Sequence, residues 1–192
     1  MGRSTGTFLA AASLLAAGPV QDAGSSDVEY RVLATSKTST LEKELNEAGL
    51  QGFRLVEMKG GETGGGQEVV AIVERPANFD TDVRYEYRLL ATNKTSTMQK
   101  ELNEAGAEGF LYVAQSVNPT MFGGQETLVA LSRRVGAPER TVAYRLLATN
   151  RTKTMHKELA EAASDGFRLV GLAVDKTAFG GAELVSILMR EQ

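Results

Sequence analysis

The sequence has no cysteine and only one histidine, His156. Without cysteine the chain cannot form disulfides, carry a lipid on an N-terminal cysteine, use a thiolate nucleophile or bind zinc through sulfur. The single histidine lies on the polar side of an expected helix, without the partners of a zinc hydrolase or of a Ser-His or Cys-His nucleophile. We therefore expect no metal site, no cofactor, no catalytic residues and no enzymatic activity.

The chain also lacks a basic surplus and a long apolar run. Its net charge is −3 and its isoelectric point is near 5.4, which argues against duplex DNA or anionic membranes as partners, because both usually require a concentrated basic surface. The apolar run at 8–17 is far shorter than the roughly 18 residues that a membrane-spanning helix needs. We expect no nucleic-acid partner and no transmembrane anchor after cleavage of the leader.

Residues 1–23 have the pattern of a signal peptide. Arg3 precedes the apolar run at 8–17, which ends at Gly18 and Pro19 and is followed by small and polar residues. This pattern predicts export, either to a periplasm or out of the cell, with a cleavage site that the sequence does not fix. A disordered cytosolic extension is the alternative.

What the sequence does have is a threefold internal repeat with a period of 57 residues (87 − 30 and 144 − 87). Residues 30–56 and 87–113 are identical at 19 of 27 positions, and the second and third copies are identical at 18 of 27. A fixed period indicates one supersecondary unit in tandem, each copy too small to bury a full core alone. We expect repeat units at 28–75, 84–134 and 141–192.

Each copy has the pattern of a β-α-β-β unit. A first strand rich in Tyr, Leu and Thr precedes a helix whose apolar stripe in the first copy is Leu41, Leu45 and Ala48. Glycine and phenylalanine then lead into a second strand, and a glycine-rich connection leads to a third, so a hairpin is expected between the last two. The expected strands are 30–35, 53–58, 69–74, 87–92, 110–115, 128–133, 144–149, 167–173 and 184–189.

The ends of the expected helices carry local signals. Capping boxes are expected at two helix starts, with a threonine one residue later as the alternative cap: Ser39 with Glu42, Ser96 with Gln99, and Thr40, Thr97 or Thr154. Gly49 and Gly106 are expected to end the first two helices in the left-handed conformation. Because Ala163 stands at this position in the third copy, its helix is expected to run further.

A motif of Leu-Asn-Glu-x-Gly-x-x-Gly-aromatic follows the first strand. In the second copy, residues 85–90 read Tyr-Glu-Tyr-Arg-Leu-Leu and residues 102–110 read Leu-Asn-Glu-Ala-Gly-Ala-Glu-Gly-Phe. These segments resemble a small bacterial domain family of unknown function, whose members typically read Tyr-x-Tyr-Lys-Val and then Leu-Asn-x-x-Gly-x-x-Gly-Trp-Glu-Leu-Val. All three copies have Phe in place of Trp, and the third has Ala160 and Ala163 in place of Asn and Gly.

The resemblance covers nearly the whole chain beyond residue 27. It implies, for each copy, a helix packed on a three-stranded antiparallel sheet, and it implies no activity or ligand. Together with the period, it predicts an α+β fold of three such units packed together with pseudo-threefold repetition.

Polar clusters at the three helix starts are the candidate ligand-binding residues. Free amides at a helix N-terminus, hydroxyls and a cation together suit an anion such as phosphate, sulfate or a carboxylate. The simpler interpretation is that the hydroxyls cap the helices and that the cations are solvated. The candidate residues are Lys37, Thr38, Thr40, Lys94, Thr95, Thr97, Arg151, Thr152 and Thr154.

Two further features of the repeat admit a functional and a structural interpretation. Carboxylates recur on the helices at Glu44, Glu101 and Glu158, which is more typical of a solvated helix face than of acid–base catalysis. Apolar pairs at 121–122 and 178–179 lie at expected hairpin tips, where they either contact a partner protein or pack between units. The sequence does not decide between these.

The sequence favours a binding function over catalysis. The first hypothesis is an exported, non-enzymatic interaction module whose three similar faces bind a protein or another component of the cell envelope, since repeated faces raise avidity. The second hypothesis is a protein that binds small anions at the helix starts.

Overall fold

The computed structural model describes residues 28–119, 125–138, 140–176 and 182–192. The predicted signal peptide and the apolar pairs at 121–122 and 178–179 lie outside the described residues. The elements are β1 (Val28–Thr35), α1 (Thr38–Leu50), β2 (Arg54–Thr63), β3 (Gly66–Pro76), β4 (Tyr85–Thr92), α2 (Thr95–Ala107), β5 (Leu111–Pro119), β6 (Gln125–Arg134), β7 (Val142–Thr149), α3 (Thr152–Ser164), β8 (Arg168–Lys176) and β9 (Ala182–Glu191).

Each repeat forms its own antiparallel sheet of three strands, with the third strand in the centre. The strand orders are β1-β3-β2, β4-β6-β5 and β7-β9-β8. The hairpin expected between the second and third strands is confirmed, and the first and second strands run parallel at the two edges, joined by the helix. The predicted α+β fold with a threefold repeat is confirmed. We call the repeats unit 1 (28–76), unit 2 (85–134) and unit 3 (142–191).

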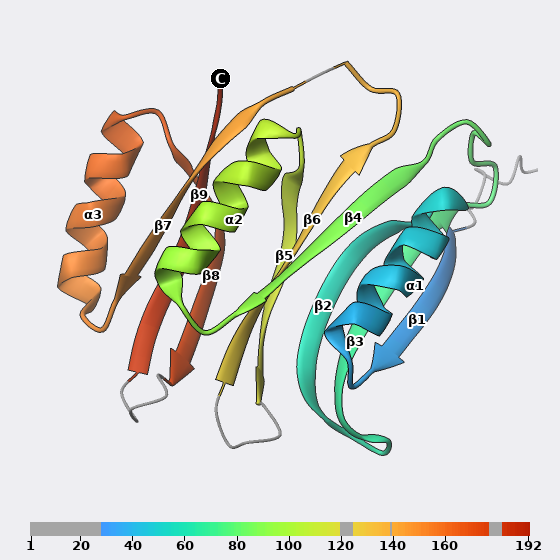
Figure 1. Cartoon of the computed structure of the whole chain (residues 1–192), viewed down its shortest axis with the longest axis horizontal. Helices are drawn as coiled ribbons and strands as arrows, with labels where there is room; N and C mark the ends of the chain where they lie inside the picture. The colour runs from blue at the N-terminus through green and yellow to red at the C-terminus, as the bar shows by residue number, and fades with distance from the viewer. Residues whose placement is uncertain (1–27, 120–124, 139, 177–181) are drawn as a thin grey trace, which may run out of the picture.

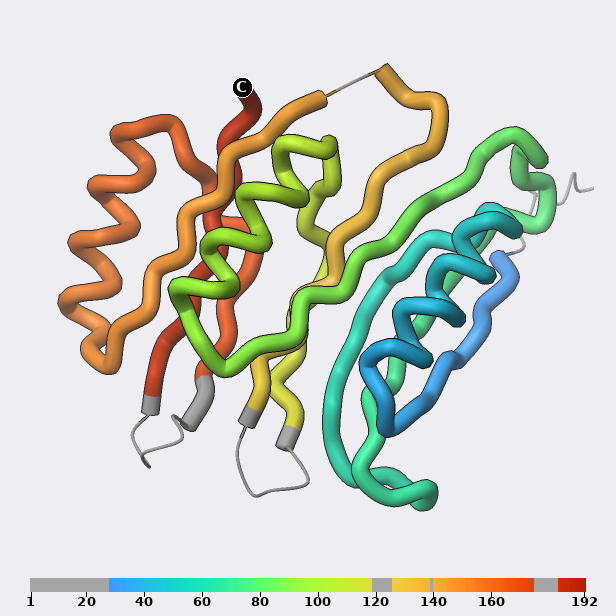
Figure 2. Tube along the Cα trace, viewed as in Figure 1, coloured from blue at the N-terminus to red at the C-terminus, as the bar shows by residue number. Residues whose placement is uncertain are grey.

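The three units stack in a row, in which helices alternate with the first strands of the following units. Figure 1 shows α1, β4, α2, β7 and α3 in this order across the molecule, and the trace in Figure 2 follows the same row. α1 contacts β4, and α2 contacts β7. The second strands β2, β5 and β8 are also neighbours along the row. The first two helices therefore lie between their own sheet and the next unit.

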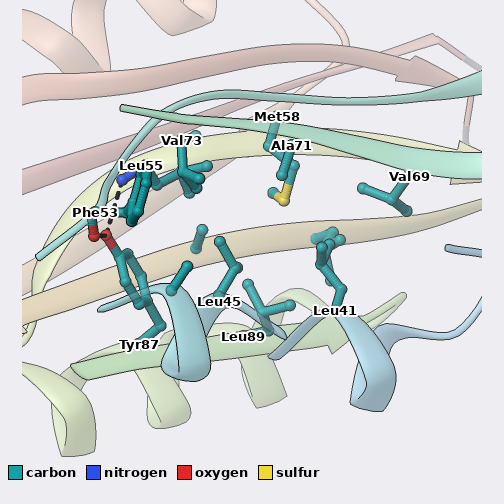
Figure 3. Close-up of a cluster of buried hydrophobic side chains, with 14 residues drawn as sticks. Leu41, Leu45, Phe53, Leu55, Met58, Val69, Ala71, Val73, Tyr87 and Leu89 are labelled. Atoms are coloured by element: carbon teal, nitrogen blue, oxygen red, sulfur yellow. Dashed lines mark hydrogen bonds between the residues drawn. The ribbon is translucent and has the colours of Figure 1, made fainter. Parts of the chain in front are cut away.

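The main cores are shared between neighbouring units. In the first core, Leu41 and Leu45 of α1 pack with Phe53 of unit 1 and with Tyr87 and Leu89 of unit 2 (Figure 3). The second core joins α2 and its sheet to residues of unit 3 in the same way. In unit 3, where no further described unit packs on the far side of α3, the described cluster contains only three buried residues: Ala162, Phe167 and Leu188. Burial of a full core therefore requires a neighbouring unit.

A buried tyrosine hydroxyl connects unit 2 to unit 1, and another connects unit 3 to unit 2. The Tyr87 hydroxyl donates a hydrogen bond to the Phe53 carbonyl oxygen at 3.1 Å and accepts one from the Leu55 amide at 2.8 Å (Figure 3). The Tyr144 hydroxyl donates to the Phe110 carbonyl oxygen at 2.9 Å. These bonds satisfy polar groups that the apolar core would otherwise leave unpaired.

Two arginines lie over the phenylalanine that follows each helix. The Arg31 and Arg75 guanidiniums lie 4.0 and 4.5 Å from the centre of the Phe53 ring. The same pairs recur around Phe110 and Phe167: Arg88 with Arg133, and Arg145 with Arg190. Acidic partners balance this charge, and their pKa values fall accordingly: Arg75 lowers the pKa of Glu29, and Arg88 lowers that of Glu108. The arginines thus join the first and third strands to the helix end.

The helix starts differ from those predicted. The N-cap residues are Lys37, Lys94 and Arg151, and none of them makes a side-chain capping bond. The predicted capping boxes are wrong, because Glu42 and Gln99 form hydrogen bonds with the next unit instead. The predicted alternative, a threonine one residue later, is also wrong, because each such threonine lies inside its helix.

The helix ends also differ. Gly52, Gly109 and Gly166 adopt positive φ after the helices, whereas Gly49 and Gly106 lie within them. The prediction of a left-handed stop at Gly49 and Gly106 is therefore wrong. Each helix has 13 residues, so the third is no longer than the others.

The Tyr87 hydroxyl provides a test of coupling between units 1 and 2. We expect Tyr87→Phe to lower the free energy of unfolding by about 1–3 kcal/mol, because the substitution removes a partner of two buried backbone groups. Urea denaturation measures this loss. The matched control is Tyr30→Phe at the equivalent position of unit 1, where the exposed side chain predicts a change within about 0.5 kcal/mol. Equal effects of the two substitutions would contradict the bridging role of Tyr87.

The difference in stability between wild type and Tyr87→Phe should also depend on pH. Burial raises the pKa of Tyr87 well above the ordinary tyrosine value of about 10. Folding thus favours the neutral hydroxyl, and its contribution is complete below about pH 10 and is lost as the pH rises further. We expect the difference in unfolding free energy between wild type and Tyr87→Phe to narrow as the pH rises from about 10 to about 12. A constant difference across this range would contradict the assignment.

Candidate functional site

The structure does not bring the three predicted ligand-binding clusters together. Each lies at the start of its own helix, and β4 or β7 lies between consecutive helices (Figure 1). The three cations, Lys37, Lys94 and Arg151, are exposed. The backbone amide of each donates a hydrogen bond to a threonine hydroxyl at the end of the first strand, Thr35, Thr92 or Thr149, at 3.1–3.3 Å. The anion hypothesis stays a prediction for three separate sites.

The polar side chains of the helices instead bind the free edge of the next unit's first strand. The Asn46 side chain donates to the Tyr87 carbonyl oxygen at 2.9 Å and accepts from the Tyr87 amide at 3.0 Å. The Glu42 carboxylate accepts from the Leu89 amide at 2.9 Å. Because β4 is an edge strand, these bonds satisfy backbone groups that no strand pairs with.

The second interface repeats this arrangement. The Gln99 side chain donates to the Tyr144 carbonyl oxygen at 2.9 Å and accepts from the Leu146 amide at 2.7 Å. The Asn103 side chain accepts from the Tyr144 amide at 3.3 Å. Helix residues at these two positions therefore hold each unit to the next one.

A glycine in the last turn of the helix allows this close approach. A Cβ atom built at Gly49 lies far inside van der Waals contact of the Tyr85 carbonyl oxygen and 3.0 Å from the Tyr87 ring. A Cβ atom at Gly106 meets the Val142 carbonyl oxygen and the Tyr144 ring in the same way. The helix can pack against strand backbone only where this side chain is absent.

Unit 1 exposes the face that units 2 and 3 bury against their predecessors. Tyr30 is 60% exposed, whereas the equivalent Tyr87 and Tyr144 are 4% and 3% exposed. Val32 is 64% exposed, whereas the equivalent Leu89 is 8% exposed. We call the surface formed by Val28, Tyr30 and Val32, together with the free edge of β1, the leading face.

Unit 3 exposes the opposite face, which units 1 and 2 bury against their successors. Leu169 and Leu172 are 50% and 55% exposed, whereas the equivalent Leu55 and Met58 of unit 1 are 5% and 0% exposed. On α3, the positions of the interface-forming Asn and Gly are alanines, and His156 replaces Glu42 and Gln99. We call the surface formed by His156, Ala160, Ala163, Leu169, Leu172 and Val174 the trailing face.

The sequence assigned Glu42 to a capping box and left Asn46 outside the apolar stripe of the helix, so the role of both side chains between units was missed. The available signal was the comparison of the copies. The motif keeps Asn46 and Asn103, and also Gly49 and Gly106, but the third copy changes both positions to alanine. That difference marks the helix that no further unit covers. The structure also shows that two of the three faces around Tyr30, Tyr87 and Tyr144 are buried between units. Those two faces therefore cannot provide the avidity expected from the repeat.

No group of three or more His, Asp or Glu side chains among the described residues is arranged to hold a metal ion. Within the same residues, no helix has the length and apolar character to cross a membrane. Of the recurring carboxylates, Glu44, Glu101 and Glu158 are half-buried on the three helices.

Comparisons with known protein families, with curated proteins and with solved structures found no match. The resemblance to a small bacterial domain family therefore stays a prediction from the motif.

The glycine within the helix gives a test of the interface geometry. We expect Gly49→Ala to lower the free energy of unfolding by at least about 1 kcal/mol through overpacking, even though alanine favours an isolated helix by about 1 kcal/mol. The matched control is the reverse substitution in unit 3, Ala163→Gly, where the exposed side chain predicts only the propensity loss of about 1 kcal/mol or less. Denaturant unfolding measures both, and a stabilising Gly49→Ala would rule out the close packing.

Proposed function

We propose that the chain is an exported, non-enzymatic interaction module that binds a protein of the cell envelope or extracellular space through its leading face. The observation that carries this proposal is the exposure of Tyr30 and Val32, whose equivalents are the main inter-unit contacts elsewhere in the same chain. The equivalent surface is buried in units 2 and 3 and exposed in unit 1.

Two physical properties of the leading face support binding. It presents Val28, Tyr30 and Val32 side by side on one face of β1, because alternate residues of a strand share a face. It also includes a free strand edge, since β1 pairs only with β3 among the described strands. Apolar side chains beside unpaired backbone groups are suited to a protein surface and not to a small ion.

The proposed location of the protein outside the cytoplasm is inferred from the sequence alone. The pattern of Arg3, the apolar run at 8–17 and the Gly18-Pro19 break supports export. The absence of cysteine is compatible with both sides of a membrane. Envelope or extracellular partners are therefore the first class to test.

Capture of partners from an envelope extract tests the proposal. We expect Val32→Asp to reduce capture of the proteins bound by wild type at least about fivefold, because a carboxylate at the centre of an apolar contact must be desolvated. Quantitative mass spectrometry of the captured proteins measures the change.

The matched control is Leu50→Asp, which changes an exposed leucine at the end of α1 that is not part of the leading face as defined. It should leave capture unchanged. Recovery of the same proteins by wild type and Val32→Asp, or no recovery above background, would overturn the proposal.

A further inference from the structure

The two internal interfaces show what kind of structure covers the leading face. This inference rests on the proposed function and names its partner. We propose that the leading face binds a further β-α-β-β unit on a different polypeptide, whose helix carries Asn and Gly at the positions of Asn46 and Gly49. The chain's own trailing face does not satisfy this requirement, so a second copy does not bind in this way.

The backbone of β1 requires the same partners as β4 and β7. In both internal interfaces, side chains of the preceding helix bind the amide and carbonyl oxygen of Tyr87 or Tyr144, and the amide two residues later. Tyr30 and Val32 occupy these positions on β1, which has the same edge place in its sheet. A docked helix would match these groups with an Asn and with a Glu or Gln that lies four residues before that Asn, as Asn46 and Glu42 do for β4.

Steric fit selects glycine on the docked helix. At both internal interfaces, a Cβ on the helix glycine meets the carbonyl oxygen of the strand residue two before the tyrosine. The equivalent residue on β1 is Val28. A docked α3 brings the Ala163 methyl against the Val28 carbonyl oxygen, and it offers Ala160 in place of Asn. The chain therefore cannot extend its own row by adding a second copy.

The second strand of unit 1 adds a requirement of its own. Glu57 and Lys59 form an ion pair of 3.5 Å at positions where unit 2 has Ala114 and Ser116. Ala114 is buried in the interface with unit 1. In unit 3 the residue equivalent to Glu57 is Gly171, and a Cβ there meets the side chains of Tyr112 and Gln115. Because an apolar side chain would desolvate the Glu57 carboxylate, the partner presents polar side chains at this position and not leucines, as Tyr112 and Gln115 of unit 2 do toward Gly171.

A variant of the full chain supplies the probe. In it the trailing face is rebuilt as a copy of the equivalent residues of unit 2, and its own leading face is blocked by Val32→Asp. The rebuilding substitutions all lie at exposed positions of unit 3: His156→Gln, Ala160→Asn, Ala163→Gly, Leu169→Tyr and Leu172→Gln. The probe can then bind wild type in one way only, so that a defined pair forms and not a filament.

Sedimentation velocity of the mixture tests the proposal. We expect wild type alone and probe alone to sediment as single chains, and the mixture to form a 1:1 complex. Restoring Ala163 in the probe should weaken the complex at least about tenfold, since the methyl overpacks the contact. Replacing wild type by Val32→Asp should abolish it.

Three outcomes would overturn the proposal. They are no complex in the mixture, a complex that survives Val32→Asp in both chains, and self-association of wild type. Circular dichroism confirms that the probe is folded. If it is not, a probe in which Leu169→Gln replaces Leu169→Tyr carries the same expectation, because it also presents no leucine to Glu57. Failure here leaves the Val32-dependent capture of an envelope protein intact, so the two proposals fail separately.

Discussion

The whole molecule depends on the contact between a helix and the backbone edge of the following unit's first strand. That edge strand has amides and carbonyl oxygens that its own sheet does not pair, and burying them unpaired in a core is costly. Asn46 and Glu42 satisfy them with side-chain atoms, and Gly49 lets the helix come close enough to do so. Once this contact forms, Tyr87 is brought into the core of unit 1, where its hydroxyl binds the backbone on both sides of the second-strand start.

Much of the fold could be predicted from the sequence, because the features that define it are local or periodic. The apolar stripe of Leu41, Leu45 and Ala48 predicted the helix, and the glycine-rich connection between two sequential strand-like segments predicted the hairpin of β2 and β3. The errors fell at positions whose role is tertiary. Glu42 three residues after Ser39 has the spacing of a capping box, and Gly49 near a helix end has the place of a left-handed stop. Both rules treat the helix as isolated, whereas here both residues contact unit 2.

The candidate site could not be predicted in the same way, because exposure depends on which units are neighbours. Tyr30, Tyr87 and Tyr144 stand at the same position of closely similar strands, and yet only the first lies at the surface. A motif predicts the chemistry of a face but not its coverage. The departures at Ala160 and Ala163 contained part of this information, since a helix without a successor no longer needs a strand-binding Asn or a close-packing Gly. Their meaning became clear only when the structure placed Asn46 and Gly49 against β4.

A row of units that stack in one direction has two chemically different ends, and adding an identical unit leaves the same two ends exposed. The row can therefore stop extending only if the residues of an end unit differ from those of the other units. Unit 3 carries such changes in its helix, where the exposed Ala163 would meet the backbone of any strand docked in the same way as β4 or β7. Unit 1 carries milder ones: Glu57 and Lys59 alter the rim beside β2, while Val28, Tyr30 and Val32 keep the apolar character of the buried equivalents. If solubility alone had shaped the ends, both would be polar. The trailing end is blocked and the leading end is only restricted, and this asymmetry favours binding at the leading face.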